Sequence, residues 1–341
     1  MAPGITEPLV QPAKISSNGS YAANSEATLW RLDTIPGKGR GLLATRDISP
    51  GTLILSDRPL ITTDVIISIE TTEKDLARAL RALPKDSQRV FLSLHNNYPG
   101  KNPLSNIVRS NGYPLGPDSD VGGVFPNISR INHSCQPNAK HAWNSKLKQQ
   151  TVYAIRPIAA GEELSLFYLQ GGTFSERQSE LQSSFGFSCA CELCSLPPAE
   201  RAASDSRIQR AQQLNSSIGD WDACRSTPRR VLADGRQLLA LYRDEGIRDD
   251  RLPNLYFDLF QVCNMHSDVA RASAFAEEYC LLKRVSEGPE STAVEEVMAY
   301  VRDPASHGSS GKTRDWVSCL GDIRRGLDRE SFEKWLWREE S

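Results

Sequence analysis

Three cysteines within six residues are the feature that most constrains this 341-residue chain. They are Cys189, Cys191 and Cys194, in the sequence CACELC. A structural zinc site closes with four ligands, so three adjacent thiolates require a fourth from another segment. We expect Cys135 as that ligand, because it is the only other cysteine in the first 200 residues and lies in a turn rich in proline and asparagine. One structural zinc would then join two distant segments; reduced cysteines without a metal are the alternative.

The remaining cysteines point to a reducing environment. Eight cysteines are too few and too unevenly spaced for a disulfide scaffold of this length. Residues 1–26 lack the layout of a signal peptide and are rich in small polar residues, so we expect a loose tail there. The expected location is therefore the nucleus, the cytoplasm or both. The cysteines that stand singly are expected in the core: Cys224, Cys263, Cys280 and Cys319.

Charge and hydropathy exclude some classes of partner. The formal net charge is −2 and no polybasic run is present, so direct nucleic-acid binding through phosphate neutralisation is not expected. No apolar run approaches the ~20 residues that a membrane-spanning helix needs. We expect a monomer without a membrane partner. The slightly acidic balance is compatible with lysine-bearing protein tails, although it is too small to identify a partner.

The hydrophobic pattern predicts a β-rich first half and a helical second half. Strand-like alternation over 28–59, 149–158 and 164–169 flanks a helical pattern at 73–95 that Pro84 interrupts. The predicted boundaries are 1–26 for the tail, 27–185 for the β-rich domain with a helical and loop insert at 60–123, 186–198 for the zinc turn, 199–302 for a helical domain, 303–313 for a flexible linker and 314–341 for a C-terminal helical segment.

Capping residues set the expected ends of two helices. The helix before the cysteine cluster is expected to begin with Ser175 as its cap and to stop at Gly186. A long helix of the second half is expected to start at Ser267 and to end at Gly288.

The sequence SRINHSCQPNA offers a second interpretation of Cys135, as a nucleophile with His133 as its base. A catalytic pair normally assembles from distant segments, and no oxyanion-hole motif accompanies this one, so we favour separate roles on opposite sides of the turn. Taken alone, Tyr168 suits a core or rim position, and the pair Glu162–Glu163 suits a solvated corner. The sequence GKGRG at 37–41 is a weak signal for anion binding, because a hairpin turn explains it equally well.

Four separated motifs, in this order, resemble the SET-domain lysine methyltransferases. They are GKGRGLLATRDISPGTLIL, GGVFPNISRINHSCQPNA, VYAIRPIAAGEELSLFY and FGFSCACELC. The resemblance covers roughly residues 28–198 and is nearest to the fungal and SMYD-like branch, in which a helical domain follows the zinc turn. Residues 60–130 contain no cysteine, so the MYND zinc module of that branch is absent.

The resemblance implies an α+β fold: a β-rich SET domain with a pseudoknot and a zinc-binding post-SET turn, followed by an all-α, repeat-like helical domain. It further implies one structural zinc and S-adenosylmethionine as cofactor. The residues carried over are Tyr168 as the catalytic tyrosine; Lys38, Gly39, Arg40, Asn111, Asn132, His133, Phe185 and Phe187 at the cofactor; and Cys135, Cys189, Cys191 and Cys194 at the zinc.

The function that the resemblance implies is methyl transfer from S-adenosylmethionine to a lysine of a protein substrate, with histone tails among the candidates. Two alternatives keep the fold: a binding or scaffold protein with little activity, and a pocket adapted to a small-molecule reaction. The residues before Tyr168 are more apolar than is common in the family, so the number of methyl groups added is not predicted.

Overall fold

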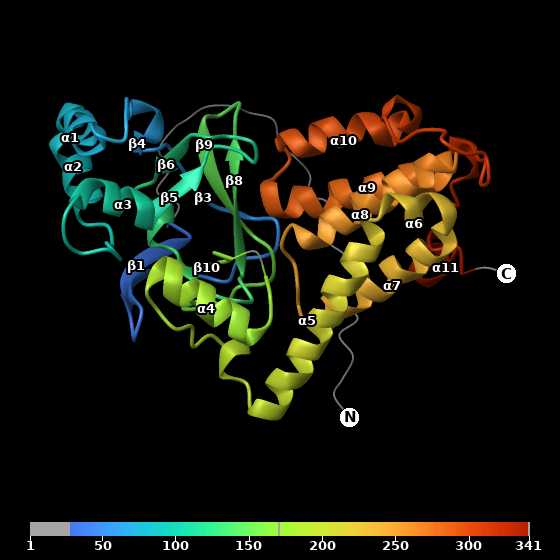
Figure 1. Ribbon diagram of the computed structural model, residues 1–341, viewed down its shortest axis with the longest axis horizontal. Helices are drawn as coiled ribbons and strands as arrows, with labels where there is room; N and C mark the ends of the chain where they lie inside the picture. The colour runs from blue at the N-terminus through green and yellow to red at the C-terminus, as the bar shows by residue number, and fades with distance from the viewer. Residues whose placement is uncertain (1–27, 170, 340–341) are drawn as a thin grey trace.

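The computed structural model describes residues 28–169 and 171–339, and the predicted tail at 1–26 lies outside them. A β-rich first half is followed by a helical second half, which confirms the α+β class (Figure 1). The small sheets lie between the helices of the insert on one side and the C-terminal helices on the other (Figure 1).

The strands form four small sheets. In the first, β1 (Trp30–Ile35) pairs with β2 (Gly39–Ala44). In the second, β9 (Gln149–Ala154) lies between β3 (Leu53–Asp57) and β8 (Ala139–Asn144), and in the third, β6 (Gly122–Val124) lies between β4 (Ile61–Thr62) and β5 (Gly112–Pro114). In the fourth, β7 (Asn132–His133) pairs with β10 (Ser165–Leu166). Apolar residues of β2, β3, β8, β9 and β10, with others from the connecting segments, form one buried cluster, in which Leu42, Val152 and Leu164 are completely enclosed.

The pairing of β7 with β10 brings two of the sequence motifs together. These two-residue strands run parallel, with Leu166 opposite His133, and the Ser134 amide donates to the Leu166 carbonyl at 3.0 Å. The Asn138 side chain stabilises this crossing. Its Nδ2 atom donates to the Glu163 carbonyl at 2.8 Å, and its Oδ1 atom accepts from the Ser165 main-chain amide at 2.8 Å. The site is built at this crossing.

The insert contains three helices and a short sheet. Helices α1 (Thr72–Ala82) and α2 (Lys85–Leu92) are separated at Pro84, as the sequence predicted, and α3 (Pro103–Asn111) follows. Leu76 and Leu80 are buried on the inner face of α1. The strands β4, β5 and β6 were expected as loop, because strands of two or three residues are too short to show alternation.

Helix α4 (Phe174–Phe185) precedes the cysteine cluster, and its predicted cap is wrong. Thr173, not Ser175, is the N-cap, in a capping box with Glu176. The predicted stop at Gly186 is confirmed, since this glycine takes the left-handed conformation with φ of 75°.

The second half is a helical domain. Its helices are α5 (Pro198–Ile218), α6 (Trp221–Ser226), α7 (Pro228–Asp244), α8 (Arg251–Met265), α9 (Val269–Glu287), α10 (Thr292–Arg302) and α11 (Arg329–Leu336). Helix α9 packs against α8, α10 and the strands β8 and β9. It is buried on most sides, which its run of alanines permits. Asp268 caps it rather than the predicted Ser267, and its stop at Gly288 is confirmed.

Two predicted features of the C-terminal region differ in the structure. The predicted linker at 303–313 packs against α8: the Asn264 amide donates to the Pro304 carbonyl at 2.9 Å and to Ser309 Oγ at 3.0 Å. The described part of the predicted helical segment at 314–341, residues 314–339, is helical only in a short 3₁₀ turn, Leu320–Asp322, and in α11. Gly326, with φ of 92°, lies between the two.

Charged side chains join the two halves. Lys140 of β8 and Lys283 of α9 both contact Asp250, with N–O distances of 2.5 and 2.7 Å, and Lys283 also contacts Glu287 at 2.6 Å. Both lysine side chains are at most 15% exposed.

In the described part of the chain, no helix combines the length and apolar character required to cross a membrane.

Candidate active site and metal centre

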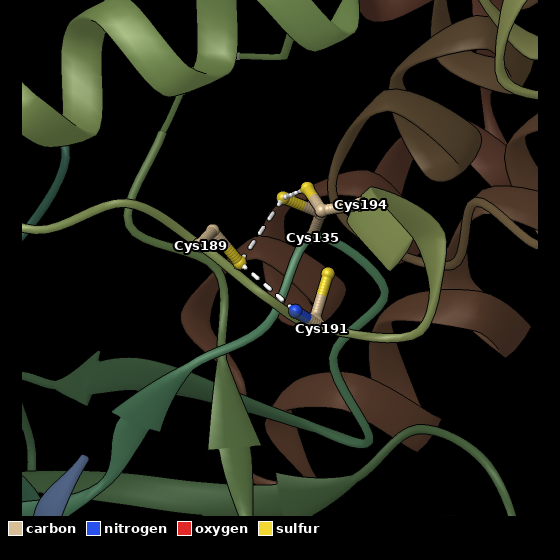
Figure 2. A group of neighbouring side chains, drawn as sticks. All are labelled: Cys135, Cys189, Cys191 and Cys194. Carbon is tan, nitrogen blue, oxygen red and sulfur yellow. Dashed lines mark hydrogen bonds between the residues drawn. The ribbon is translucent and has the colours of Figure 1, made fainter. Parts of the chain in front are cut away.

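The four predicted zinc ligands lie together (Figure 2). Cys135 follows β7, Cys189 and Cys191 come from the loop after α4, and Cys194 belongs to the 3₁₀ turn Leu193–Ser195. The Cys135 sulfur lies 3.5 Å from that of Cys194 and 4.0 Å from that of Cys189, and all four sulfurs are within 4.8 Å of one another.

This spacing fits a tetrahedral zinc site. Four sulfurs bonded to one zinc at ~2.3 Å lie ~3.8 Å from one another, which is close to the sulfur spacing of the cluster. The pKa of the Cys135 thiol is raised far above its ordinary value by its contacts with Cys189, Cys191 and Cys194, and further by burial. Four thiolates this close require a cation among them. The donor set of Cys135, Cys189, Cys191 and Cys194 therefore suits Zn²⁺.

Tyr168 lies beside the crossing of β7 and β10. Its hydroxyl donates to the main-chain carbonyl of Ile131 at 2.5 Å, and its amide donates to His133 Nδ1 at 3.2 Å. Its ring centroid lies 5.1 Å from that of Phe185 and 5.2 Å from that of His133. Burial first, then the neighbouring Tyr113 and Glu163, raise the pKa of Tyr168 well above its ordinary value. The phenol is therefore a neutral hydroxyl, fixed in direction.

The His133 side chain connects Tyr168 to the cysteine cluster. It is only 3% exposed, and its Nε2 lies 3.3 Å from the Cys135 sulfur. Because Nδ1 accepts the Tyr168 amide hydrogen, the proton of the neutral ring is on Nε2 and points to that sulfur. Burial lowers the pKa of His133 to about 4. The expectation that His133 and Cys135 take opposite sides of the turn is wrong, because residues two apart in an extended segment face the same side and these two side chains are in contact.

The other predicted cofactor residues fall into two groups. Phe187 lies beside the rings of Tyr168, His133 and Phe185. Its ring centroid is 6.4 Å from that of Phe185 and 6.2 Å from that of His133. Lys38, Gly39 and Arg40 lie at the β1–β2 turn, where Lys38 Nζ contacts Glu163 at 2.7 Å.

Glu163 links this turn to the β7–β10 crossing. Its second oxygen accepts from the Asn132 amide at 2.9 Å, and the same amide lies 3.4 Å from the Arg40 carbonyl. Sequence reasoning missed this role, since a glutamate after a glycine turn is usually solvated. Gly41 leaves room for the Asn132 side chain, because a Cβ at position 41 would lie only 2.7 Å from Asn132 Nδ2.

Asn111 stands apart from both groups. It ends α3 and is 5% exposed, and its amide donates to the carbonyls of His95 at 2.7 Å and Ile107 at 2.8 Å. Both amide hydrogens are therefore used within the chain. Its own main-chain carbonyl accepts from Ser129 Oγ at 3.0 Å, which ties α3 to the segment before β7.

Comparison with known proteins agrees with this geometry. Residues 39–169 match the SET domain family. The chain is 33% identical over 287 residues to the histone-lysine N-methyltransferase set5 of Schizosaccharomyces pombe, which covers 83% of this chain and 86% of that protein. It is 39% identical over 77 residues to human histone-lysine N-methyltransferase SMYD3, covering 22% of this chain and 18% of that protein.

A third relative also covers more than half of this chain. Mouse protein-lysine N-methyltransferase SMYD4 is 25% identical over 215 residues, covering 60% of this chain and 24% of that protein. The similarity to set5 spans most of both chains and includes the paired β7–β10 crossing and Tyr168. The chain thus belongs to the SET-domain family of S-adenosylmethionine-dependent protein-lysine methyltransferases, in its SMYD-like branch.

Proposed function

We propose that this protein methylates a lysine of a histone, and that Tyr168 is its catalytic residue. The observation that carries the proposal is the hydrogen bond from the Tyr168 hydroxyl to the Ile131 carbonyl, which fixes the phenolic oxygen at the crossing of the two family motifs. The histone substrate is inferred from relatives that are named histone-lysine methyltransferases.

Methyl transfer to lysine needs alignment more than acid or base strength. S-adenosylmethionine supplies, when bound, an electrophilic methyl group on a sulfonium, and the amine must approach in line with the breaking bond. The amine must also be neutral, whereas a free lysine has a pKa near ~10.4. An apolar site beside a cation lowers that value. Because Tyr168 donates its proton to Ile131, its oxygen lone pairs remain available to orient the incoming amine.

We assign cofactor binding to the two groups of residues around the crossing. Lys38 and Arg40 carry the positive charge that a carboxylate requires, with Gly39 between them, and Asn132 is held beside them by Glu163. Phe185 and Phe187 offer aromatic faces for stacking, and the buried His133 supports them through its ring and its main chain. Asn111 would contact the cofactor only through its Oδ1 atom, since its amide hydrogens are used.

The proposed zinc would have a structural role here. Its four thiolate ligands tie the loop that carries Phe187 to the turn after β7. Gln178 of α4 supports the same loop, because it accepts from the Cys189 amide at 2.9 Å and donates to the Cys189 carbonyl at 2.8 Å. Loss of the metal would therefore release the aromatic residues from the site.

The test is methyl transfer with tritiated S-adenosylmethionine and purified core histones, with the wild-type protein and Tyr168→Phe compared side by side. Label in histone with the wild type, and a loss of about 100-fold or more in the variant, supports the proposal. Label in small molecules alone, or cofactor binding without any transfer, would instead favour a different substrate class or a binding role. We propose that the protein is located in the nucleus or the cytoplasm. We also propose that it is a monomer, and gel filtration tests this oligomeric state.

A further inference from the structure

Arg177 is a buried cation next to the cysteine cluster. It lies in the first turns of α4 and is only 3% exposed. Its Nη2 atom lies 4.0 Å from the Cys194 sulfur, and its Nη1 atom donates to the Gly172 carbonyl at 2.6 Å. Its Nε atom is buried without a hydrogen-bond partner.

No carboxylate of the described residues lies within ion-pair distance of Arg177. Arg177 lines a pocket with two acidic residues that already pair with other arginines: Glu245 with Arg207, and Asp249 with Arg251 at 2.6 Å. Arg251 also lies close enough to Arg177 for the two positive charges to repel. The side chains that line this pocket therefore carry an excess of positive charge.

A buried guanidinium needs a compensating anion. It cannot release its proton in a protein, and a buried charge without a partner costs several kcal/mol. The groups in contact with Arg177 are a neutral carbonyl and the cysteine cluster. Four thiolates around one Zn²⁺ carry a net charge of about −2, which supplies the missing anion. Four neutral thiols would leave Arg177 uncompensated.

The second contact of Arg177 leads to the catalytic tyrosine. Gly172 follows Tyr168 by four residues, and Gly171 and Gly172 have φ angles of 124° and 106°, which other residues rarely adopt. Arg177 thus holds Gly172 against the metal centre. His133 holds the main chain of Tyr168 from the other side, through the Tyr168 amide and the Cys135 sulfur.

We infer that Arg177 is a positioning residue, which balances the charge of the zinc–thiolate centre and fixes Gly172, four residues after Tyr168, to that centre through the Gly172 carbonyl. The second part rests on the proposed function, and the first does not. The inference explains why an arginine is buried in a helix whose other charged residues are exposed.

The test measures zinc affinity in the full chain by competition with a chromophoric chelator, for the wild type and two variants. Arg177→Lys keeps the charge and should remain within about fivefold of the wild type, whereas Arg177→Gln removes the charge and should bind zinc about 10- to 100-fold more weakly. Arg201→Met is the matched control: Arg201 stacks on Phe174 of α4, 4.2 Å from the ring centroid, and touches no cysteine, so its zinc affinity should equal that of the wild type.

Equal zinc affinity in the lysine and glutamine variants, whether high or low, would overturn the charge-balancing role. For the positioning role, kcat of zinc-loaded Arg177→Gln should fall about 10-fold while KM for the cofactor changes little. An unchanged kcat would overturn that part. If no methyl transfer is found for any variant, the proposed function fails and the zinc affinities still decide the charge-balancing role.

Discussion

The hydroxyl of Tyr168 donates to the main-chain carbonyl of Ile131, the residue that directly precedes Asn132 in β7. Ile131 is fully buried, so the acceptor is rigid. A tyrosine from one motif is thereby fixed to the backbone of another, and its remaining lone pairs have a defined direction. This bond is the basis of the catalytic role that we propose for Tyr168.

The pH dependence of kcat should not contain the ionisation of Tyr168. Burial, with Tyr113 and Glu163 nearby, holds the pKa of its hydroxyl well above the ordinary value of 10.0, so the phenol stays protonated over the assay range. We expect kcat to rise with pH as the bound amine loses its proton, and to level off below about pH 10, because the site lowers the pKa of that amine from its free value. Tyr168→Phe should give a profile of the same shape at a lower level. A descending limb present only in the wild type would contradict this.

Removal of one cysteine of the cluster should remove the metal. Cys191 is buried among the other three cysteines, and Cys191→Ser should contain well under one zinc per chain by elemental analysis. The thermal transition of the β-rich half should also fall, because metal binding contributes to local folding. Cys319→Ser is the control: the expectation of a core position is wrong for Cys319, which is exposed and outside the cluster, so this variant should keep one zinc. Zinc retained in Cys191→Ser would sink the proposed ligand set.

Gly41→Ala should weaken cofactor binding. The added Cβ would lie 2.7 Å from both Asn132 Nδ2 and Ile35 Cγ1, and 3.2 Å from Glu163 Oε1, so Asn132 must move. We expect the Kd for S-adenosylmethionine, measured by calorimetry, to rise about 10-fold, which corresponds to about 1.4 kcal/mol. Gly308→Ala, where a Cβ meets nothing within 4 Å, should bind like the wild type. Equal affinities in the two variants would exclude Asn132 from the cofactor site.

Asp250 should stabilise the docking of the helical half in a pH-dependent manner. Burial alone would raise its pKa, but Lys140 and Lys283 outweigh burial and lower the pKa to about 2 from an ordinary 3.8. The stabilisation is therefore complete above about pH 4 and is lost as the pH falls towards 2. Asp250→Asn should lower the free energy of unfolding at neutral pH by about 1–2 kcal/mol, because two buried ammonium groups lose a partner.

Denaturant unfolding at several pH values checks this prediction. The difference between Asp250→Asn and the wild type should be constant from about pH 7 to pH 5 and should shrink below about pH 4. Glu295→Gln is the control, since the Lys146–Glu295 pair also joins the two halves but is exposed, with side chains 55% and 65% accessible. Its cost should stay below about 0.5 kcal/mol. A difference that grows as the pH falls would refute the assignment.

The four cysteines were predictable because their residue type and spacing carry their chemistry. Three thiols in one turn require a fourth, and few candidates exist in the first half of the chain. The helix break at Pro84 and the stop at Gly186 were predictable for similar reasons, because both residues restrict the backbone locally. The capping box of Thr173 with Glu176 also had a signal, the pattern Thr-x-x-Glu, which the choice of Ser175 overlooked.

Features that depend on the crossing of distant segments could not be predicted. The direction of the His133 ring follows from its contacts with the Tyr168 amide and the Cys135 sulfur, and the contacts of Glu163 follow from the approach of the β1–β2 turn. Arg177 resembles an ordinary exposed helix residue until the cysteine loop folds over it. The segment 303–313 has the composition of a linker, and its contacts with Asn264, His266 and Ser267 hold it in place.

The most direct test of the proposed reaction is mass spectrometry of core histones incubated with S-adenosylmethionine and either the wild-type protein or Tyr168→Phe. Both proteins should first be shown by calorimetry to bind the cofactor with similar affinity. We expect methyl-lysine at one or a few histone sites with the wild type, and a rate lower by about 100-fold or more with the variant. Equal methylation by the two proteins would contradict the catalytic role of Tyr168.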